Sequence, residues 1–441
     1  MSVVRLYAGL IINPLETSSA APHLDYIPDG CLIVDEQGII QFVGTLTDAT
    51  MRFAETQIQR FDNAVILPGL VDTHVHLPQY QAAAVGTGEL LEWLNTYIFP
   101  LEARFVDEQY ARVQAERFFR DALAVGTTTM SVYCSSHKTA THVAFEAAFN
   151  AGVRVCMGKT MMDTGAPDIL LSTPAQNIHD SMELAQRWHD ADSGRIQYTL
   201  TPRFAGSCSW KLMLECGTVA QTEGLRVQTH LAENPSELAL IAELFPKAAS
   251  YADVYEQTGL LTEKTLLAHS IYLSSEERSL LKQRNCAIAH CPCSNRFLQS
   301  GVMPLRSMMN EGFRIGLGSD VAGGFSLSVM NEAREAAENS KTWNIMNRGG
   351  ALPALSAEEA LWLATLGGAQ ALGLGDTVGS FKVGKEADFI VVGLDALMPR
   401  DTVFHSYPNL AARLVYGTAG MKVERTFVRG KELYRRGDST R

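Results

Sequence analysis

Four histidines and one aspartate of this chain stand where apolar runs of sequence end. His74 and His76 close one such run, and residues two apart on a strand point to the same face, so both imidazoles should face one interior. His230, His269 and Asp320 end three later runs. Imidazole and carboxylate groups are ligands of first-row metal ions. The convergence of these side chains would therefore form a metal site.

Eight apolar runs form the central part of the chain, at residues 67–76, 127–133, 154–161, 196–204, 226–232, 265–271, 286–291 and 313–318. Amphipathic stretches with a helical period, such as residues 106–124 and 139–150, separate them. Strands that alternate with helices of about 10–15 residues indicate a parallel sheet. Eight such units predict a closed (β/α)8 barrel, whose active site lies at the carboxyl ends of the strands. The five candidate ligands stand at those ends.

Short β-rich runs precede and follow this central part. They lie at residues 3–7, 31–34, 39–43 and 65–67 near the start, and at 388–392, 414–416 and 423–428 near the end. We predict an α/β fold in which both chain ends build a small β-sandwich domain beside the barrel. The predicted division gives 1–67 and 376–441 to the sandwich and 68–375 to the barrel.

The charge of the chain excludes some classes of partner. Its 37 basic and 48 acidic residues give a formal net charge of −11. Phosphate backbones and anionic membranes repel a chain of that sign, so we expect neither nucleic acid nor a membrane as partner. No apolar stretch approaches the roughly 18 residues of a membrane span, and the N-terminus lacks a signal-peptide pattern. Eight cysteines without zinc or disulfide spacing favour reduced thiols, so we expect a cytoplasmic protein.

The remaining histidines receive structural interpretations. A lone histidine on an apolar strand is more often a core residue than a ligand, and we interpret His290 in the seventh run in this way. The other six fall in loops, on helical faces or in the flanking β segments, where we expect them to be solvated: His23, His137, His142, His179, His189 and His405.

The candidate ligands belong to a known pattern. Pro68-Gly-Leu-Val-Asp-Thr-His-Val-His76, followed by His230, His269 and Asp320 at later strand ends, resembles the amidohydrolase superfamily of metal-dependent hydrolases. The tail Gly379-Ser-Phe-Lys-Val-Gly-Lys-Glu-Ala-Asp388 is similar to that superfamily's return into the β domain. The resemblance covers nearly the whole chain and implies a metal-dependent hydrolase on a barrel.

The number of metal ions follows from the same resemblance. Dinuclear members carry a modified lysine at the end of the fourth strand, but residues 200–204 read Leu-Thr-Pro-Arg-Phe here. Lys159 belongs to the third run, where we interpret it as structural. The resemblance therefore implies one metal ion, as in the deaminase branch, with four ligands: His74, His76, His230 and Asp320. We expect Zn²⁺, and Fe²⁺ accepts the same ligands.

The deaminase branch also implies roles for three acid–base groups. Glu233 stands three residues after His230, a spacing that resembles the proton shuttle of the deaminases. By the same resemblance, His269 would hold the attacking water and Asp320 would share its proton.

Five further motifs together resemble the guanine deaminases, one family of this superfamily: His76-Leu-Pro-Gln79, Leu91-Glu-Trp-Leu94, Gly158-Lys-Thr-Met-Met-Asp163, Pro202-Arg-Phe204 and Asp320-Val-Ala-Gly-Gly324. The resemblance implies deamination of guanine to xanthine and ammonia, by an enzyme that is commonly a homodimer. Two positions depart from the family pattern, since Gly206 replaces a proline and Ser319 replaces a threonine. Both departures leave the ligands intact, but Gly206 can alter the substrate loop.

The expected substrate contacts follow from the chemistry of guanine. Arg203 can direct N–H groups toward the purine carbonyl, Gln79 offers a donor and an acceptor, and Phe204 can form an apolar wall. Because arginine cannot accept a hydrogen bond, Arg203 would favour the C6 carbonyl of guanine over the C6 amine of adenine. Glu233 would carry a proton to the ring nitrogen beside C2.

Three alternatives stay open at this point. Another aminated heterocycle, such as a pterin, 8-oxoguanine or cytosine, would use the same metal and Glu233. A ring-amide hydrolase generally uses the dinuclear lysine site, which residues 200–204 lack. A non-catalytic barrel scaffold would be expected to have lost ligands, and all of the candidate ligands are present.

Overall fold

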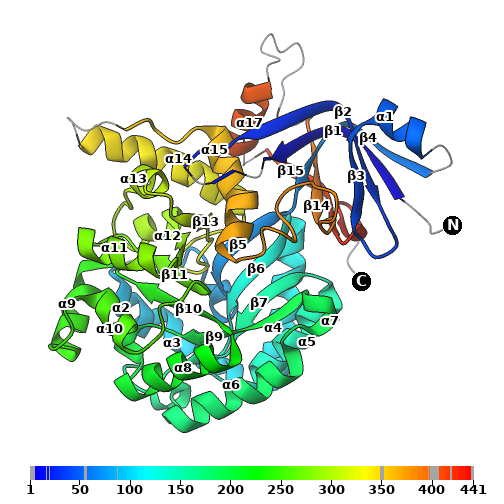
Figure 1. The fold of residues 1–441 in the computed structure, drawn as a ribbon. Helices are drawn as coiled ribbons and strands as arrows, with labels where there is room; N and C mark the ends of the chain where they lie inside the picture. Colours follow the sequence, from blue (N-terminus) through cyan, green and yellow to red (C-terminus); the bar gives the residue numbers. More distant parts are fainter. Residues whose placement is uncertain are drawn as a thin grey trace.

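The computed structural model describes residues 5–15, 17–18, 20–53, 57–86, 88–347, 352–395, 397, 407–417 and 420–438. His405 and the first two residues of the strand expected at 3–7 lie outside the described residues. Figure 1 shows a barrel of strands surrounded by helices, with a separate sheet beside it where the two ends of the chain meet.

The described residues contain the predicted barrel. Its eight strands are β5 (Leu70–His76), β6 (Thr127–Tyr133), β7 (Arg154–Gly158), β9 (Ile196–Pro202), β10 (Arg226–Leu231), β11 (Thr265–His269), β12 (Ala287–His290) and β13 (Arg314–Leu317). They are hydrogen-bonded in this order, and every neighbouring pair is parallel. The short strand β8 (Thr160–Met161) pairs with β9. The predicted (β/α)8 barrel is confirmed.

The barrel closes where its first and last strands meet. The N–H of Asp320 donates to the carbonyl of His74 at 2.8 Å, and the N–H of His76 donates to the carbonyl of Val321 at 3.1 Å. At Gly316 in β13, an added Cβ would lie 2.3 Å from Cγ2 of Thr73, so only a glycine allows the two strands to approach. Closure therefore brings the predicted ligands of β5 and β13 together.

Helices cover the outside of the barrel (Figure 1). They are α4 (Glu108–Ala124), α5 (Lys138–Ala151), α6 (Pro174–Trp188), α7 (Ala191–Gly194), α8 (Trp210–Glu223), α9 (Pro235–Leu244), α10 (Tyr251–Gln257), α11 (Ser275–Gln283), α12 (Pro292–Phe297), α13 (Leu305–Asn310), α14 (Val329–Met346), α15 (Ala357–Trp362) and α16 (Gly368–Ala371). Short helical turns connect other elements: η4 (Asp168–Leu170), η5 (Ala205–Ser207) and η6 (Leu363–Gly367). The helices begin at capping residues such as Asn234 and Ser274, whose side chains accept hydrogen bonds from free N–H groups.

The connection between β5 and α4 forms a chain of short helices over the barrel mouth. It comprises η1 (Leu77–Ala82), α2 (Leu90–Trp93), η2 (Leu94–Ile98), α3 (Phe99–Ala103) and η3 (Arg104–Val106). Its apolar side chains, including Trp93 and Phe99, are buried. This connection supplies part of the site described below.

Both ends of the chain build the second sheet, as predicted. Its strands run in the order β16 (Lys431–Arg435), β15 (Lys422–Val428), β14 (Phe389–Gly393), β4 (Gln57–Pro68), β1 (Arg5–Pro14), β2 (Leu24–Val34) and β3 (Ile40–Thr45). Neighbouring strands are antiparallel except β1 and β4. The helix α1 (Leu46–Arg52) follows β3. Gly69 alone separates β4 from β5, so the sheet leads directly into the barrel.

One expected strand is wrong. Residues 414–416 belong to a helix, α17 (Tyr407–Tyr416), which packs against α14 and α15. The buried residues Leu410, Ala411, Leu414 and Val415 recur at the spacing of one helical face. A three-residue apolar run carries too little periodicity to distinguish a strand from such a face.

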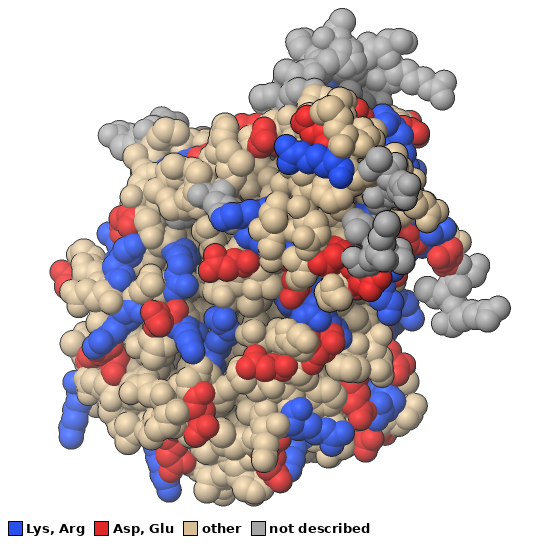
Figure 2. All heavy atoms as spheres, turned by 45° about the vertical axis from the view of Figure 1, so that its right-hand side comes forward, with Lys and Arg blue, Asp and Glu red and all other residues tan. Residues whose placement is uncertain are grey.

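The surface carries charges of both signs. On the face shown in Figure 2, acidic and basic side chains are interspersed among uncharged residues. Among the described residues, no helix is both long enough and apolar enough to span a membrane.

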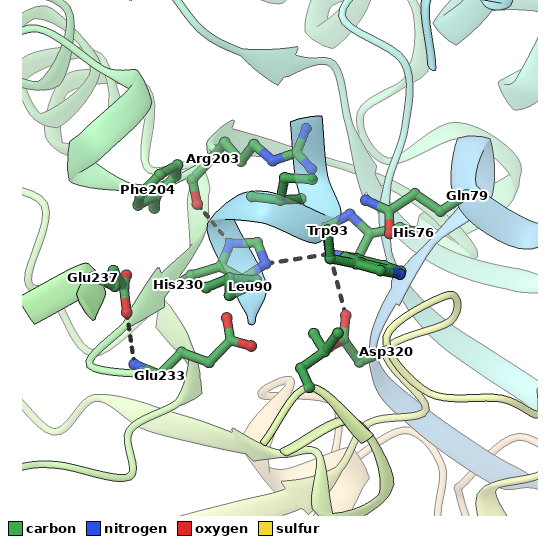
Figure 3. Close-up of a pocket in the computed structure, with 12 residues that line it drawn as sticks. His76, Gln79, Leu90, Trp93, Arg203, Phe204, His230, Glu233, Glu237 and Asp320 are labelled. Atoms are coloured by element: carbon green, nitrogen blue, oxygen red, sulfur yellow. Dashed lines mark hydrogen bonds and ion pairs between the residues drawn. The ribbon is translucent and has the colours of Figure 1, made fainter. Parts of the chain in front are cut away.

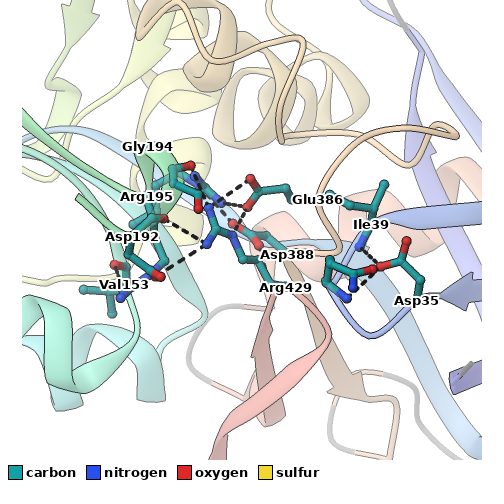
Figure 4. Close-up of polar contacts among 12 residues, drawn as sticks. Asp35, Ile39, Val153, Asp192, Gly194, Arg195, Glu386, Asp388 and Arg429 are labelled. Carbon is teal, nitrogen blue, oxygen red and sulfur yellow. Dashed lines mark hydrogen bonds and ion pairs between the residues drawn. The ribbon is translucent and has the colours of Figure 1, made fainter. Parts of the chain in front are cut away.

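Buried ion pairs join the barrel to the sheet. Arg154 of β7 is almost fully buried, and its guanidinium pairs with Asp388 at 3.2 Å and with Glu386. Burial opposes the charge, but the two carboxylates hold the pKa of Arg154 above its usual value. Arg429 also pairs with Glu386 (Figure 4). The acidic residues of the tail motif therefore fix the sheet against the bottom of the barrel.

We predict that Arg154→Met lowers the free energy of unfolding by about 3–5 kcal/mol, because it leaves Asp388 buried without its cation. Arg60→Met is the matched control, since Arg60 pairs with two exposed carboxylates and should leave the unfolding midpoint nearly unchanged. Urea unfolding followed by circular dichroism measures both. Equal midpoints for the two variants would contradict the role given to Arg154.

Candidate active site

Three histidines and an aspartate converge at the carboxyl ends of the barrel strands. Nε2 of His76 lies 3.2 Å from Nε2 of His74 and 3.2 Å from Nε2 of His230. Oδ1 of Asp320 lies 3.1 Å from Nε2 of His74 and 3.3 Å from Nε2 of His76. All four side chains are buried, and Figure 3 shows three of them at the base of one pocket.

The imidazoles of this cluster are neutral. Burial lowers the pKa of His74, takes that of His76 to about 4 and holds that of His230 well below its usual value. Nδ1 of His230 lies 2.6 Å from the carbonyl of Arg203, and a carbonyl can only accept, so Nδ1 carries the proton. The lone pair on Nε2 of His230 is therefore directed toward His76.

This donor set fits a metal ion. With their Nε2 atoms unprotonated, as metal binding requires, imidazoles 3.1–3.3 Å from one another and from a carboxylate oxygen direct their lone pairs to one point that a cation can occupy. Donor atoms placed roughly 2.0–2.1 Å from a tetrahedral zinc ion lie about 3.3–3.4 Å apart. The spacing of these side chains is close to that value, so the cluster is a metal-binding arrangement.

His269 lies at the edge of the cluster. Its Nε2 is 3.3 Å from Oε2 of Glu233 and 3.8 Å from Oδ2 of Asp320, and it makes no hydrogen bond within the described part of the chain. Its Nδ1 faces Oδ1 of Asn295 at 2.8 Å, which fixes the proton on Nδ1. Nε2 is directed toward the space between the cluster and Glu233.

Several residues of the site have a backbone in the left-handed conformation, which sets the direction of their side chains. The φ angles of Ala232, His269 and Asp320 are 50°, 66° and 45°. Residues with a side chain rarely adopt this conformation, which costs of order 1–3 kcal/mol each and is commonest at functional sites. The turns redirect the chain at the strand ends, so that the side chains face the barrel mouth.

Glu233 lies opposite the cluster across the pocket (Figure 3). Its backbone N–H donates to Oε2 of Glu237 at 2.8 Å, and Oγ of Ser300 donates to Oε1 of Glu233 at 3.4 Å. Burial raises the pKa of Glu233 well above its usual value, and the charges of Asp320 and Glu237 raise it further. A carboxyl group with a raised pKa takes up a proton more readily than an ordinary carboxylate, which suits a group that must both accept and release protons.

A pocket lies above the cluster. The predicted substrate residues Gln79, Arg203 and Phe204 all line it, together with Glu233. Four apolar residues that line the pocket were not predicted as site residues from the sequence: Leu90, Trp93, Leu94 and Leu298. Leu90, Trp93 and Leu94 lie in or beside the motif at residues 91–94, and this motif was the feature of the sequence that could have identified them as lining residues.

The sequence analysis also missed Glu102, which is buried behind the pocket and bonds to two of its polar groups. Oε2 of Glu102 accepts from Nη1 of Arg203 at 2.7 Å, and Oε1 accepts from Nε2 of Gln79 at 2.9 Å. The only signal in the sequence is an acidic residue within the apolar stretch at residues 98–103.

Both departures from the family pattern are accommodated. At Gly206, an added Cβ would lie 2.4 Å from Cε2 of Phe204, so the phenyl ring occupies the space that a side chain would need. The N–H of Ser319 donates to Oδ1 of Asp72 at 2.9 Å through its backbone, which any residue can supply.

Several interpretations of other residues are corrected. His23 and His179 are exposed as expected, but the other helical and loop histidines of the described residues are partly buried. One of them, His142, accepts a hydrogen bond from Nε1 of Trp188 at 3.0 Å because its helix faces the neighbouring helix. His290 is buried as expected, yet neither ring nitrogen has a partner among the described residues. Lys159 donates to Oδ1 of Asn177 at 2.7 Å, in line with its structural interpretation.

Comparison with known proteins agrees with this geometry. The profile of the Amidohydrolase family matches residues 65–433. The guanine deaminase of Escherichia coli strain K12 is 36% identical over 431 residues, covering 97% of this chain and 95% of that protein. The human guanine deaminase is 35% identical over 378 residues, covering 83% and 82%.

Solved structures give the same result. The Escherichia coli guanine deaminase superposes with a TM-score of 0.92 at 34% identity, over 98% of this chain and 100% of that one. The guanine deaminase of C. acetobutylicum with bound guanine gives a TM-score of 0.90 at 32% identity, with the same coverage. The resemblance inferred from the motifs is confirmed, and the chain belongs to the amidohydrolase family, in which these relatives are guanine deaminases.

Proposed function

We propose that this protein is a guanine deaminase, which hydrolyses guanine to xanthine and ammonia with one metal ion per chain. The observation that carries the proposal is the position of Glu233 and Arg203 on one pocket, above a cluster of neutral imidazoles and a carboxylate. The relatives named above, one of which binds guanine in its active site, support the choice of substrate. The proposed ion is zinc, and the proposed form is a cytoplasmic homodimer.

The proposed ligands are His74, His76, His230 and Asp320. When bound, the ion would lower the pKa of water at the site toward about 7, which makes a hydroxide nucleophile available at neutral pH. His269 would hold the attacking water through Nε2, and the carboxylate of Asp320 would share its proton.

Glu233 is the proposed proton carrier. Attack at C2 of guanine forms a tetrahedral carbon, which requires a proton on the adjacent ring nitrogen. Glu233 would take the proton from the water, give it to that nitrogen and then help to protonate the departing amine, so that ammonia leaves. Its raised pKa suits both directions of transfer.

Arg203 and the apolar walls are the proposed basis of recognition. The guanidinium would donate to the C6 carbonyl, and Gln79 would bond a second part of the purine edge. Phe204, Leu90 and Trp93 would enclose the flat ring from its sides, since all three line the pocket.

We predict about one tightly held metal ion per chain in carefully purified protein, because four donors converge on one point. Elemental analysis by mass spectrometry measures the content. Two tightly held ions per chain would contradict the mononuclear site.

We predict that Glu233→Gln lowers turnover roughly 10²–10⁴-fold while the metal is retained, because the variant loses proton transfer and no ligand. His230→Ala should instead lose the metal. Glu243→Gln makes the same chemical change on the exposed side of α9. It serves as the control and should leave turnover unchanged. Near-native turnover by Glu233→Gln would refute the shuttle.

We predict efficient ammonia release from guanine and almost none from adenine or cytosine. A site that bonds one polar group can reject an analogue that lacks it by roughly 10⁴–10⁵-fold, because buried groups then stay unpaired. Arg203→Met should weaken guanine binding and reduce this preference with the metal retained, whereas Arg187→Met on the exposed face of α6 should not. Ammonia release across purines, a pterin and 8-oxoguanine measures the preference. Much faster turnover of a pterin or cytosine would overturn the substrate while leaving the deaminase chemistry.

A further inference from the structure

Glu102 binds two polar side chains that line the pocket, Gln79 and Arg203, which together form the polar wall of the pocket. It lies in α3, is 7% exposed, and uses one carboxylate oxygen for Arg203 and the other for Gln79. These two side chains come from different elements, since Gln79 belongs to η1 and Arg203 follows β9. Both polar groups of the wall are therefore held by a single buried anion.

Glu102 and Phe99 hold the guanidinium of Arg203 from two sides. Nη1 donates to Glu102 at 2.7 Å, and the ring centroid of Phe99 lies 5.2 Å from Cζ. Within the described residues, the hydrogen bonds of the guanidinium all involve Nη1, so Nε and Nη2 are left to meet a ligand. Figure 3 shows the side chain at the wall of the pocket.

Glu102 also fixes the orientation of the Gln79 amide. The carboxylate can only accept, so it faces Nε2 of Gln79 at 2.9 Å. The opposite side of the amide, Oε1, accepts from the backbone N–H of Ala322 at 3.4 Å. One N–H of Gln79 remains for a ligand, while its oxygen already has a donor.

The wall therefore presents N–H groups of both side chains, and each oxygen beside them already accepts one hydrogen bond. Such a wall matches a ring edge that carries acceptor atoms, such as a carbonyl oxygen, and an amino group facing Arg203 would find no acceptor, because a guanidinium only donates. We propose that Glu102 is a positioning residue that determines this selectivity, by holding Arg203 and Gln79 with their donors toward the substrate. This inference rests on the proposed function and extends it from the residues that contact the purine to the one that orients them.

The test uses Glu102→Gln, which keeps the shape of the side chain and removes one acceptor. Its amide oxygen can accept from Arg203 or from Gln79, but its NH₂ group then faces the other donor. We expect kcat/KM for guanine to fall about 10–100-fold, mainly through KM, because one charge-assisted bond is lost and one donor is left unpaired. The ratio of guanine to adenine turnover should fall as well, with metal content unchanged.

Two variants separate positioning from general damage. Glu102→Asp keeps the charge on a shorter side chain and should recover part of the selectivity. Glu116→Gln makes the same chemical change on the exposed side of α4 and should leave KM, kcat and the substrate ratio as in the parent. A Glu102→Gln enzyme with the parent's KM and substrate ratio would overturn the proposal.

A double variant keeps the test decisive if Glu102→Gln alone does not fold. In Arg203→Met the carboxylate of Glu102 loses its cation, and removing both partners of a buried ion pair is tolerated better than removing one. The double variant Arg203→Met, Glu102→Gln should therefore be at least as stable and as active toward guanine as Arg203→Met. The amide oxygen at position 102 can still accept from Gln79 in this variant, so a further loss of about tenfold or more would come from neither contact and would overturn the proposal. A parent enzyme that releases no ammonia from guanine would instead overturn the proposed function itself.

Discussion

One buried site holds four potential metal ligands in mutual contact, and both the barrel junction and the pocket depend on it. Nitrogens of His74, His76 and His230 and an oxygen of Asp320 face one another at 3.1–3.3 Å in a buried site, where no bulk water weakens their interaction. A cation bound among their lone pairs would make all of these contacts attractive. The same strands close the barrel, since the N–H of Asp320 bonds to the carbonyl of His74. Barrel closure and metal binding therefore depend on one junction.

The pocket and the cluster are connected through single residues. The carbonyl of Arg203 holds Nδ1 of His230 at 2.6 Å, while the side chain of Arg203 forms the polar wall. Asn295 fixes the tautomer of His269 in the same way. Partners of this kind orient ligands and tune their basicity. A change at Arg203 that shifts its backbone would consequently affect the metal site as well as substrate recognition.

The sequence predicted the parts of this structure that obey local rules. The two-residue repeat of a strand places His74 and His76 on one face, and the order of a parallel barrel brings distant strand ends to one rim. Glu102 follows no such rule, because its partner Arg203 is 101 residues away and the pairing depends on how α3 packs on the barrel mouth. Residues 414–416 were misjudged because a strand and a helical face look alike over three residues.

The proposed site holds one metal ion among four donors, with Glu233 outside its ligands. Anomalous diffraction at the absorption edge of the bound metal tests it most directly, because the map locates the ion among the side chains. We expect one peak within coordination distance of Nε2 of His74, His76 and His230 and of the carboxylate of Asp320. A peak coordinated by Glu233, or two peaks in the same pocket, would contradict it.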